Sequence, residues 1–136
     1  MIKRVLFVCK YNRFRSKIAE ILFKKYNQNK LYEARSAGVI KGAYPLDDKE
    51  VSVAKEMGIN LKGRPQGLSN DLLIWQDIII VVADDVPAVL FKENKKYGKK
   101  LIIWKVPDFK HGKKQEIKKI INSIEDYVIK FSKQLK

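Results

Sequence analysis

Two kinds of hydrophobic pattern alternate along the chain. Short apolar runs, typical of strands buried in a parallel sheet, occupy residues 4–8, 32–36, 77–82 and 101–106. Apolar residues at helical spacing predict helices at residues 18–26, 46–57, 69–75, 86–95 and 113–135. Strands that alternate with helices are joined by right-handed crossovers, so the pattern predicts an α/β fold with helices on both faces of a parallel sheet.

The length and composition indicate one globular domain over residues 1–136. Hydrophobic residues make up 46% of the chain and charged residues 32%, as in ordinary folded proteins. No apolar run approaches the roughly 18 residues that a membrane span needs. The apolar segment at residues 2–9 is too short for a signal peptide. We therefore expect a cytoplasmic protein with no membrane partner.

The excess of basic residues has two interpretations. The formal net charge of +14 would attract nucleic acid, acidic substrates or other anions. However, the lysines are spread along most of the chain, and no arginine-rich tract or basic–aromatic RNA motif occurs. A lysine-rich solvated surface is the simpler interpretation, and nucleic-acid binding stays an alternative.

The chain has a single cysteine, Cys9, and a single histidine, His111. One cysteine cannot form an internal disulfide, and these two residues supply too few ligands for a zinc site. We therefore expect chemistry without a metal or other cofactor. Cys9 is then either a buried small hydrophobe or a nucleophile. His111 is expected in an exposed loop and is left out of the catalytic set.

In proteins with a parallel α/β sheet, ligands bind beyond the carboxyl ends of the strands. Three predicted loops leave strands there, at residues 9–16, 83–87 and 107–112. The first has a Cys-x5-Arg-Ser spacing and comprises Cys9, Lys10, Tyr11, Asn12, Arg13, Phe14, Arg15 and Ser16. A loop of this length can curl so that its N–H groups converge on one tetrahedral oxyanion, helped by the positive end of the following helix.

The residue types in this loop suit attack on a phosphoryl group. The planar guanidinium of Arg15 can bind two phosphate oxygens, while the sulfur of Cys9 lies beneath the phosphorus for in-line attack. Amide dipoles and Arg15 favour the thiolate, to which Ser16 can donate a hydrogen bond. The bare spacing also arises by chance, with Cys9 as a packed thiol and Arg15 as a surface charge. Its place between a strand and a helix favours a phosphate-binding loop.

The loop resembles that of the low-molecular-weight protein tyrosine phosphatase superfamily, which includes thioredoxin-coupled arsenate reductases. The resemblance rests on Val8, Cys9, Asn12, Arg15, Ser16, Ala19 and Glu20. Further matches follow in the family's order at residues 36–38, 58–59, 77–79, 84 and 104–108, so the resemblance covers almost the whole chain. It implies a three-layer fold with a four-stranded parallel sheet in the order 2-1-3-4.

The resemblance also implies roles for individual residues. Asp108 stands at the position of the family's catalytic acid, which protonates the leaving oxygen and then activates water against phosphocysteine. Without the resemblance, Asp108 would merely turn the chain after Pro107. Asn12 matches an asparagine that shapes the loop, and Ser36 matches a serine that supports it. The implied activity is that of a phosphomonoester hydrolase of the protein tyrosine phosphatase type, acting on a phosphotyrosine protein or a small phosphomonoester.

Three departures from the family's pattern concern the substrate and the oxidation of the thiol. Tyr11 replaces a glycine that is common two places after the nucleophile. Phe14 replaces a second cysteine, so protection of Cys9 from oxidation would need an external thiol. The proline and tyrosines that usually follow the acid are replaced by residues 109–111. The wall of the substrate pocket would then be built from Phe109, Tyr11 or Tyr44.

Two alternatives to a phosphatase stay open. An arsenate reductase would need an external thiol, because no cysteine lies between residues 77 and 101 or elsewhere beyond Cys9 to relay the oxidation. A protein that binds oxyanions or nucleic acid without catalysis would explain the basic charge and the altered loop. A phosphotransferase subunit with a phosphorylated cysteine is less well supported, because it leaves Arg15 unexplained.

Overall fold

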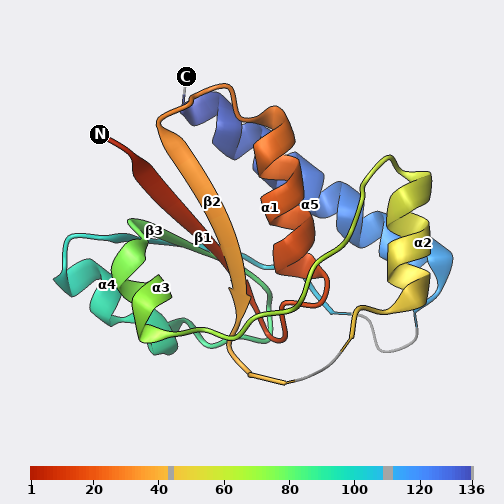
Figure 1. Cartoon of the computed structure of the whole chain (residues 1–136), viewed down its shortest axis with the longest axis horizontal. Coiled ribbons are helices and arrows are strands. Elements are labelled where there is room, and N and C mark those ends of the chain that lie inside the picture. The colour runs from red at the N-terminus through yellow and green to blue at the C-terminus, as the bar shows by residue number, and fades with distance from the viewer. Residues whose placement is uncertain (43–44, 109–111, 136) are drawn as a thin grey trace.

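A computed structural model describes residues 1–42, 45–108 and 112–135. Its single sheet has four parallel strands in the order β2-β1-β3-β4 (Figure 1). The strands are β1 (Lys3–Cys9), β2 (Tyr32–Gly38), β3 (Ile78–Val82) and β4 (Lys100–Trp104). The predicted α/β class and the strand order implied by the resemblance are both confirmed.

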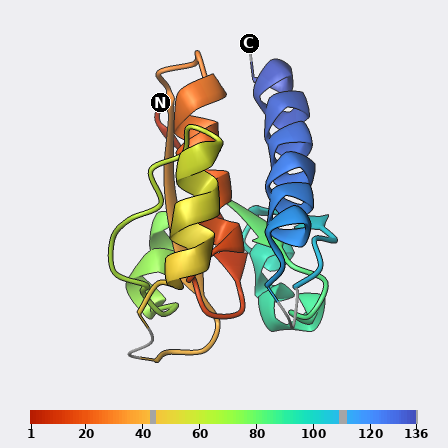
Figure 2. The same ribbon diagram turned by 90° about the vertical axis from the view of Figure 1, so that its right-hand side faces the viewer.

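Helices cover both faces of the sheet. One face is covered by α1 (Arg15–Tyr26) and α5 (Lys114–Gln134), which pack side by side, with α2 (Asp48–Glu56) against α5 (Figures 1 and 2). The other face is covered by α3 (Asn70–Trp75), a 3₁₀ helix η1 (Ala88–Phe91) and α4 (Glu93–Lys96). None of the described helices is both long and apolar enough to cross a membrane.

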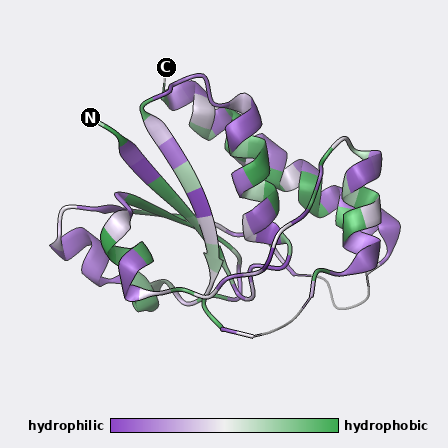
Figure 3. Cartoon of the chain, viewed as in Figure 1, coloured by the Kyte–Doolittle hydropathy of each residue, from purple (hydrophilic) through white to green (hydrophobic). Residues whose placement is uncertain are grey.

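The alternation of side chains along β1 explains why its sequence is apolar without interruption. Val5 and Phe7 pack with α1 and α5, while Leu6 and Val8 pack on the opposite face, and all four are fully buried. The strand β3 is likewise hydrophobic along its whole length, whereas the edge strand β2 alternates with polar residues (Figure 3).

Several boundaries differ from the predicted ones for local reasons. The helix predicted over residues 86–95 is divided into one 3₁₀ turn and one short α-helical turn. The strand β2 continues to Gly38 because Gly38 still pairs with Cys9 of β1. The helix α2 begins after Asp47, whose side chain accepts hydrogen bonds from the N–H groups of Lys49 and Glu50.

The last strand ends earlier than predicted. A hydrogen bond of 2.8 Å from the N–H of Val106 to the carbonyl of Trp104 turns the chain out of the sheet after Trp104. Because all four strands are parallel, the loops after β1, β3 and β4 lie at the same edge of the sheet. The predictions that concern Tyr44, Phe109 and His111 lie outside the described residues.

Candidate active site

The loop after β1 is a series of bends from Lys10 to Phe14, and α1 begins directly at Arg15. Asn12 is the one described non-glycine residue with a positive φ, 59°, a conformation that asparagine tolerates better than most residues. No side chain caps the first turn of α1. The first N–H groups of a helix have no partner within the helix, so this end of α1 favours an anion.

Gly38 allows this loop to lie against the end of β2. A Cβ atom at position 38 would stand 2.5 Å from the carbonyl carbon of Tyr11 and 2.7 Å from the nitrogen of Asn12. Both are backbone atoms, so no side-chain rotation would relieve the overlap. The sequence marked Gly38 only as one of several family matches; the close approach supplies its physical reason.

The thiol of Cys9 lies in a network of hydrogen bonds with three of the predicted site residues. Its sulfur is 3.0 Å from the hydroxyl oxygen of Ser16 and accepts a hydrogen bond of 3.3 Å from the N–H of Asn12. The side-chain amide of Asn12 donates to the hydroxyl oxygens of Ser16, at 2.7 Å, and Ser36, at 3.0 Å. Since Ser16 accepts from Asn12, its own proton is available to the sulfur.

Residues outside the predicted set extend this network. The hydroxyl of Ser36 donates to Glu20 over 2.5 Å, and the other carboxylate oxygen of Glu20 pairs with Lys24 at 2.6 Å. The N–H of Gln66 donates to the side-chain oxygen of Asn12 at 2.9 Å. Glu20 was recognised only as part of a motif, although its place one helical turn after Ser16 puts it on the same face of α1.

Arg15 is held by the loops that follow β3 and β4. Its side chain is 4% exposed, and it donates hydrogen bonds of 2.9 Å to the carbonyl of Val106 and to the carboxylate of Asp85. A carboxylate oxygen of Asp108 lies 4.0 Å from the same guanidinium. Asp85 was not predicted; the resemblance pointed instead to Asp84, and the sequence contains no signal for which of the two faces Arg15.

These residues surround one small cleft of about 60 Å³. Its lining consists of Cys9, Tyr11, Arg13, Phe14, Arg15, Glu50 and Asp108. All three residues predicted as catalytic, Cys9, Arg15 and Asp108, therefore lie at the same cleft. One water molecule needs about 10–15 Å³ of cavity volume measured in this way, so the cleft has room for several waters or for one small anion such as a tetrahedral oxyanion.

The remaining predicted loop residues have separate surroundings. The ammonium of Lys10 lies over the ring of Tyr11, 5.3 Å from its centroid. Arg13 donates a hydrogen bond of 2.8 Å to the carbonyl of Pro45, which ties the loop to the segment before α2. Phe14 is 5% exposed and packs in the core shared by α1 and α5, so at this position the chain has a core side chain instead of a second thiol.

Glu50 of α2 also lines the cleft, and the sequence did not predict this residue as part of the site. Glu50 is only 8% exposed. Burial, followed by the negative charge of Asp47, raises the pKa of Glu50 to about 7, against an opposing effect of Arg13. In the sequence, an acidic residue in the first turn of a helix is indistinguishable from an ordinary surface charge.

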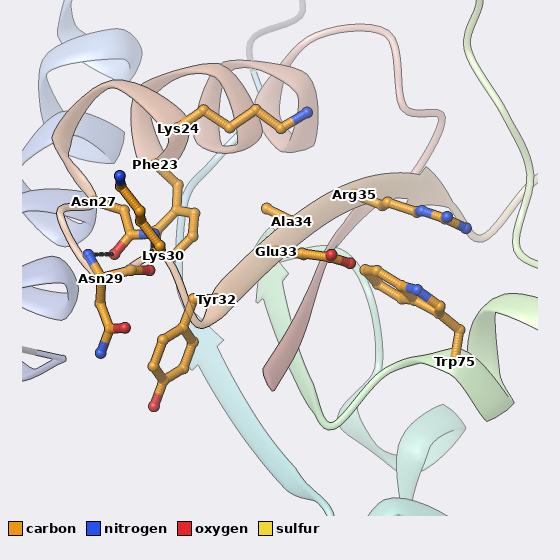
Figure 4. A pocket seen from close by; sticks show the side chains of 10 residues that line it. All are labelled: Phe23, Lys24, Asn27, Asn29, Lys30, Tyr32, Glu33, Ala34, Arg35 and Trp75. Carbon is orange, nitrogen blue, oxygen red and sulfur yellow. Dashed lines mark hydrogen bonds between the residues drawn. The ribbon is translucent and has the colours of Figure 1, made fainter. Parts of the chain in front are cut away.

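A larger hollow of about 430 Å³ lies beside β2, and one of its lining residues, Lys24, pairs with Glu20 of the network around Cys9 (Figure 4). Its polar and aromatic lining includes Lys24, Lys30, Arg35 and Trp75, and the guanidinium carbon of Arg35 is 4.5 Å from the centroid of the Trp75 ring. None of the residues predicted as catalytic contributes to it. The residues predicted as catalytic therefore gather at the small cleft and not at this hollow.

A parallel α/β sheet with a buried thiol and a buried arginine on one strand-to-helix loop defines a class of cysteine-containing oxyanion sites. The family model described as "Low molecular weight phosphotyrosine protein phosphatase" matches residues 4–136. The chain belongs to this family, and it is an enzyme of the hydrolase class.

Solved structures of similar proteins agree with this assignment. The low-molecular-weight protein tyrosine phosphatase of T. tengcongensis is 28% identical, with 98% of this chain and 99% of that chain covered and a TM-score of 0.82. The arsenate reductase of Archaeoglobus fulgidus is 25% identical, with coverages of 95% and 98% and a TM-score of 0.72. The YwlE arginine phosphatase of Geobacillus stearothermophilus, 23% identical, shares the fold, with coverages of 98% and 92% and a TM-score of 0.82.

Proposed function

We propose that this protein is a cysteine-dependent phosphomonoester hydrolase of the protein tyrosine phosphatase type that works through a phosphocysteine intermediate. One observation carries the proposal: the thiol of Cys9, the buried guanidinium of Arg15 and the carboxyl of Asp108 share a cleft of about 60 Å³. Cys9 is assigned as the nucleophile, Arg15 as the phosphate ligand and Asp108 as the acid and base.

In the first step the sulfur of Cys9 attacks the phosphorus, forming an S–P bond while the P–O bond to the leaving group breaks. The hydrogen bonds from Asn12 and Ser16 hold the thiolate at the bottom of the loop before attack. They also favour its departure in the second step, because they stabilise the same charge. The residues beyond them, Ser36 and Glu20, keep the amide of Asn12 in place.

Arg15 has hydrogen-bond capacity left for a substrate. A guanidinium has five N–H donors, and the hydrogen bonds to Val106 and Asp85 use one donor on each of the two terminal nitrogens. The remaining donors can bind phosphate oxygens in the bidentate manner that arginine favours. Because Val106 and Asp85 fix the guanidinium before substrate arrives, little side-chain freedom is lost on binding.

Asp108 would donate its proton to the leaving oxygen as Cys9 attacks. As a carboxylate it would then take a proton from a water molecule, whose oxygen attacks the phosphorus and displaces the thiolate of Cys9. This returns the sulfur, the carboxyl and the charge of the site to their starting state. Inorganic phosphate is the second product.

The substrate in this proposal is a phosphotyrosine protein or a small phosphomonoester. The family description names phosphotyrosine proteins. The cleft itself has room for the phosphoryl group, and the aromatic side chain of Tyr11 in its lining offers a surface for the ring of a substrate. We place the enzyme in the cytoplasm, because a reducing compartment keeps a lone catalytic thiol reduced.

Arsenate reduction is a second candidate, favoured by the similarity to the Archaeoglobus fulgidus arsenate reductase over 95% of this chain. Arsenate is tetrahedral like phosphate, and the thiolate of Cys9 would displace one oxygen to form an S–As bond. An external thiol would attack the sulfur, so that arsenic receives two electrons and leaves as arsenite. A second external thiol would reduce the mixed disulfide. Arsenite formation that depends on both Cys9 and added thiol would support this activity.

Hydrolysis of p-nitrophenyl phosphate by freshly reduced protein, at mildly acidic pH, tests the phosphatase. We expect turnover that vanadate inhibits and that falls by about a thousandfold or more in Cys9→Ala. Thermal unfolding of both proteins controls for a folding defect. Undiminished turnover in folded Cys9→Ala would refute the assignment of the nucleophile.

A further inference from the structure

Glu50 is a buried acid in a cleft that otherwise suits an anion. It is 8% exposed, and it lines the same cleft of about 60 Å³ as Cys9 and Arg15. Its backbone N–H donates to Asp47, but its carboxyl forms no hydrogen bond or ion pair with any residue that the structure describes. The carboxyl oxygens of Glu50 are not among the fully buried atoms that lack a partner, so they are open to the cleft, where a bound ligand can contact them.

Charged groups face Glu50 from each element around it. Asp47 precedes it at the start of α2, Arg13 and Arg15 lie on the loop after β1, and Asp108 follows β4. On the side of α5, Lys114 and Lys118 act on Glu56 rather than on Glu50. The effect of burial on the pKa of Glu50 outweighs the opposite effect of the two arginines. The pKa is therefore raised to about 7, and both protonation states exist at neutral pH.

We propose that Glu50 is a specificity-determining residue, and that the cleft binds a doubly charged oxyanion more tightly when the carboxyl of Glu50 carries a proton. An ionised carboxylate and a dianion in so small a cleft repel each other, and at distances of several ångströms this weakens binding on the order of tenfold or more. The protonated carboxyl has no such charge and offers a hydrogen-bond donor to the oxyanion. Binding of the oxyanion is therefore coupled to the uptake of one proton by Glu50.

This role differs from the one proposed for Asp108. Asp108 is a half-exposed residue of the cleft lining and would transfer a proton during the reaction. Glu50 acts earlier, by setting how the affinity for the phosphoryl group depends on pH. Above about pH 7 the loss of its proton raises KM and leaves kcat at saturating substrate nearly unchanged. The inference rests on the proposed function only in that the cleft binds an oxyanion.

Calorimetric binding of sulfate, whose charge is constant from about pH 5.5 to about pH 8.5, tests the proposal without any catalytic step. Comparison of buffers with different ionisation enthalpies measures the protons taken up. In the wild type we expect the affinity to fall by up to about tenfold per pH unit above about pH 7, with an uptake approaching one proton. In Glu50→Gln, the affinity for sulfate should fall less steeply with pH, and fewer protons should be taken up on binding, because residue 50 no longer binds a proton.

Glu56→Gln is the matched control. Glu56 lies on the same helix, and its side chain is 48% exposed and paired with Lys114 at 2.9 Å. Its substitution should leave the wild-type slope and proton uptake unchanged. If Glu50→Gln does not fold, Glu50→Ala replaces it, with the same expected loss of slope.

Equal slopes and equal proton uptake in the wild type and a folded Glu50 variant overturn the inference. If hydrolysis that depends on Cys9 persists in that case, the proposed function still stands. Absence of sulfate binding by both proteins at every pH also overturns the inference, and it counts against the oxyanion site of the proposed function as well.

Discussion

One methyl group added at Gly38 would test whether the loop after β1 depends on close contact with the end of β2. A Cβ atom there would lie 2.5 Å from the carbonyl carbon and 2.8 Å from the Cα of Tyr11, and 2.7 Å from the nitrogen of Asn12. Gly38 cannot simply retreat, because it pairs with Cys9 and its N–H donates to the carbonyl of Gln66 at 2.8 Å. The substitution Gly38→Ala therefore forces the loop to move.

The size of the effect follows from that movement. An overlap with backbone atoms is relieved by a shift of about 1 Å, and overpacking of this kind costs about 1–3 kcal/mol of the free energy of unfolding. For a chain of 136 residues this corresponds to a fall in Tm of roughly 3–5 °C per kcal/mol. A displacement of about 1 Å in the groups that position the substrate also lowers kcat/KM by about a hundredfold.

Thermal unfolding and kcat/KM for p-nitrophenyl phosphate measure the two effects. Gly58→Ala is the control, because a Cβ atom at position 58 meets none of the described atoms within 4 Å, and the positive φ of Gly58, 79°, strains the substituted backbone without moving the loop after β1. We expect Gly58→Ala to cost about 1–2 kcal/mol of the free energy of unfolding through backbone strain and to leave kcat/KM nearly unchanged. Wild-type stability and activity in Gly38→Ala would refute the argument that the loop and β2 are in contact.

Three further substitutions have distinct expected results. Asp85→Asn removes the charged partner of buried Arg15. It should lower stability by about 1–3 kcal/mol in unfolding assays and kcat/KM by about ten- to a hundredfold. Wild-type stability and kcat/KM in this variant would show that Val106 alone suffices to hold Arg15. Asp108→Asn should lower kcat more than it raises KM in steady-state assays, and an unchanged kcat would exclude Asp108 as the acid. The pKa of Glu50 is about 7 in the folded protein, against an ordinary value of 4.5, so the folded protein holds a proton that the unfolded chain releases, and stability falls as pH rises through that range. Glu50→Gln should thus raise the free energy of unfolding by up to about 3 kcal/mol above about pH 8 and change it little near about pH 4, in denaturant titrations; a gain that is equal at both pH values would contradict this.

The features of the fold that could be predicted from the sequence are the ones that leave a local pattern. The uninterrupted apolar run of β3 is such a pattern, because burial on both faces excludes polar residues at every position. The order of the strands was implied by the resemblance, not by periodicity, which does not record which strands are neighbours. The short turns at Ala88–Phe91 and Glu93–Lys96 were merged into one helix, because a few apolar residues at helical spacing do not distinguish a 3₁₀ turn from an α-helix.

The same distinction holds for the site. Cys9, Arg15 and Ser16 belong to one loop, so their spacing is visible in the sequence. Glu50 lines the cleft from a distant part of the chain, and Asp85 is 70 residues away from the arginine that it binds. Their roles depend on how the loops and α2 pack, which no local signal records.

Detection of the covalent intermediate tests the central claim most directly. Asp108→Asn slows the attack of water, so a reaction with p-nitrophenyl phosphate that is quenched rapidly should accumulate the phosphorylated enzyme for mass spectrometry. The account predicts one phosphoryl group on the peptide that contains Cys9, and none in the same experiment with Cys9→Ala. A phosphoryl group on any other residue, or turnover with no phosphorylated enzyme at any time, would contradict it.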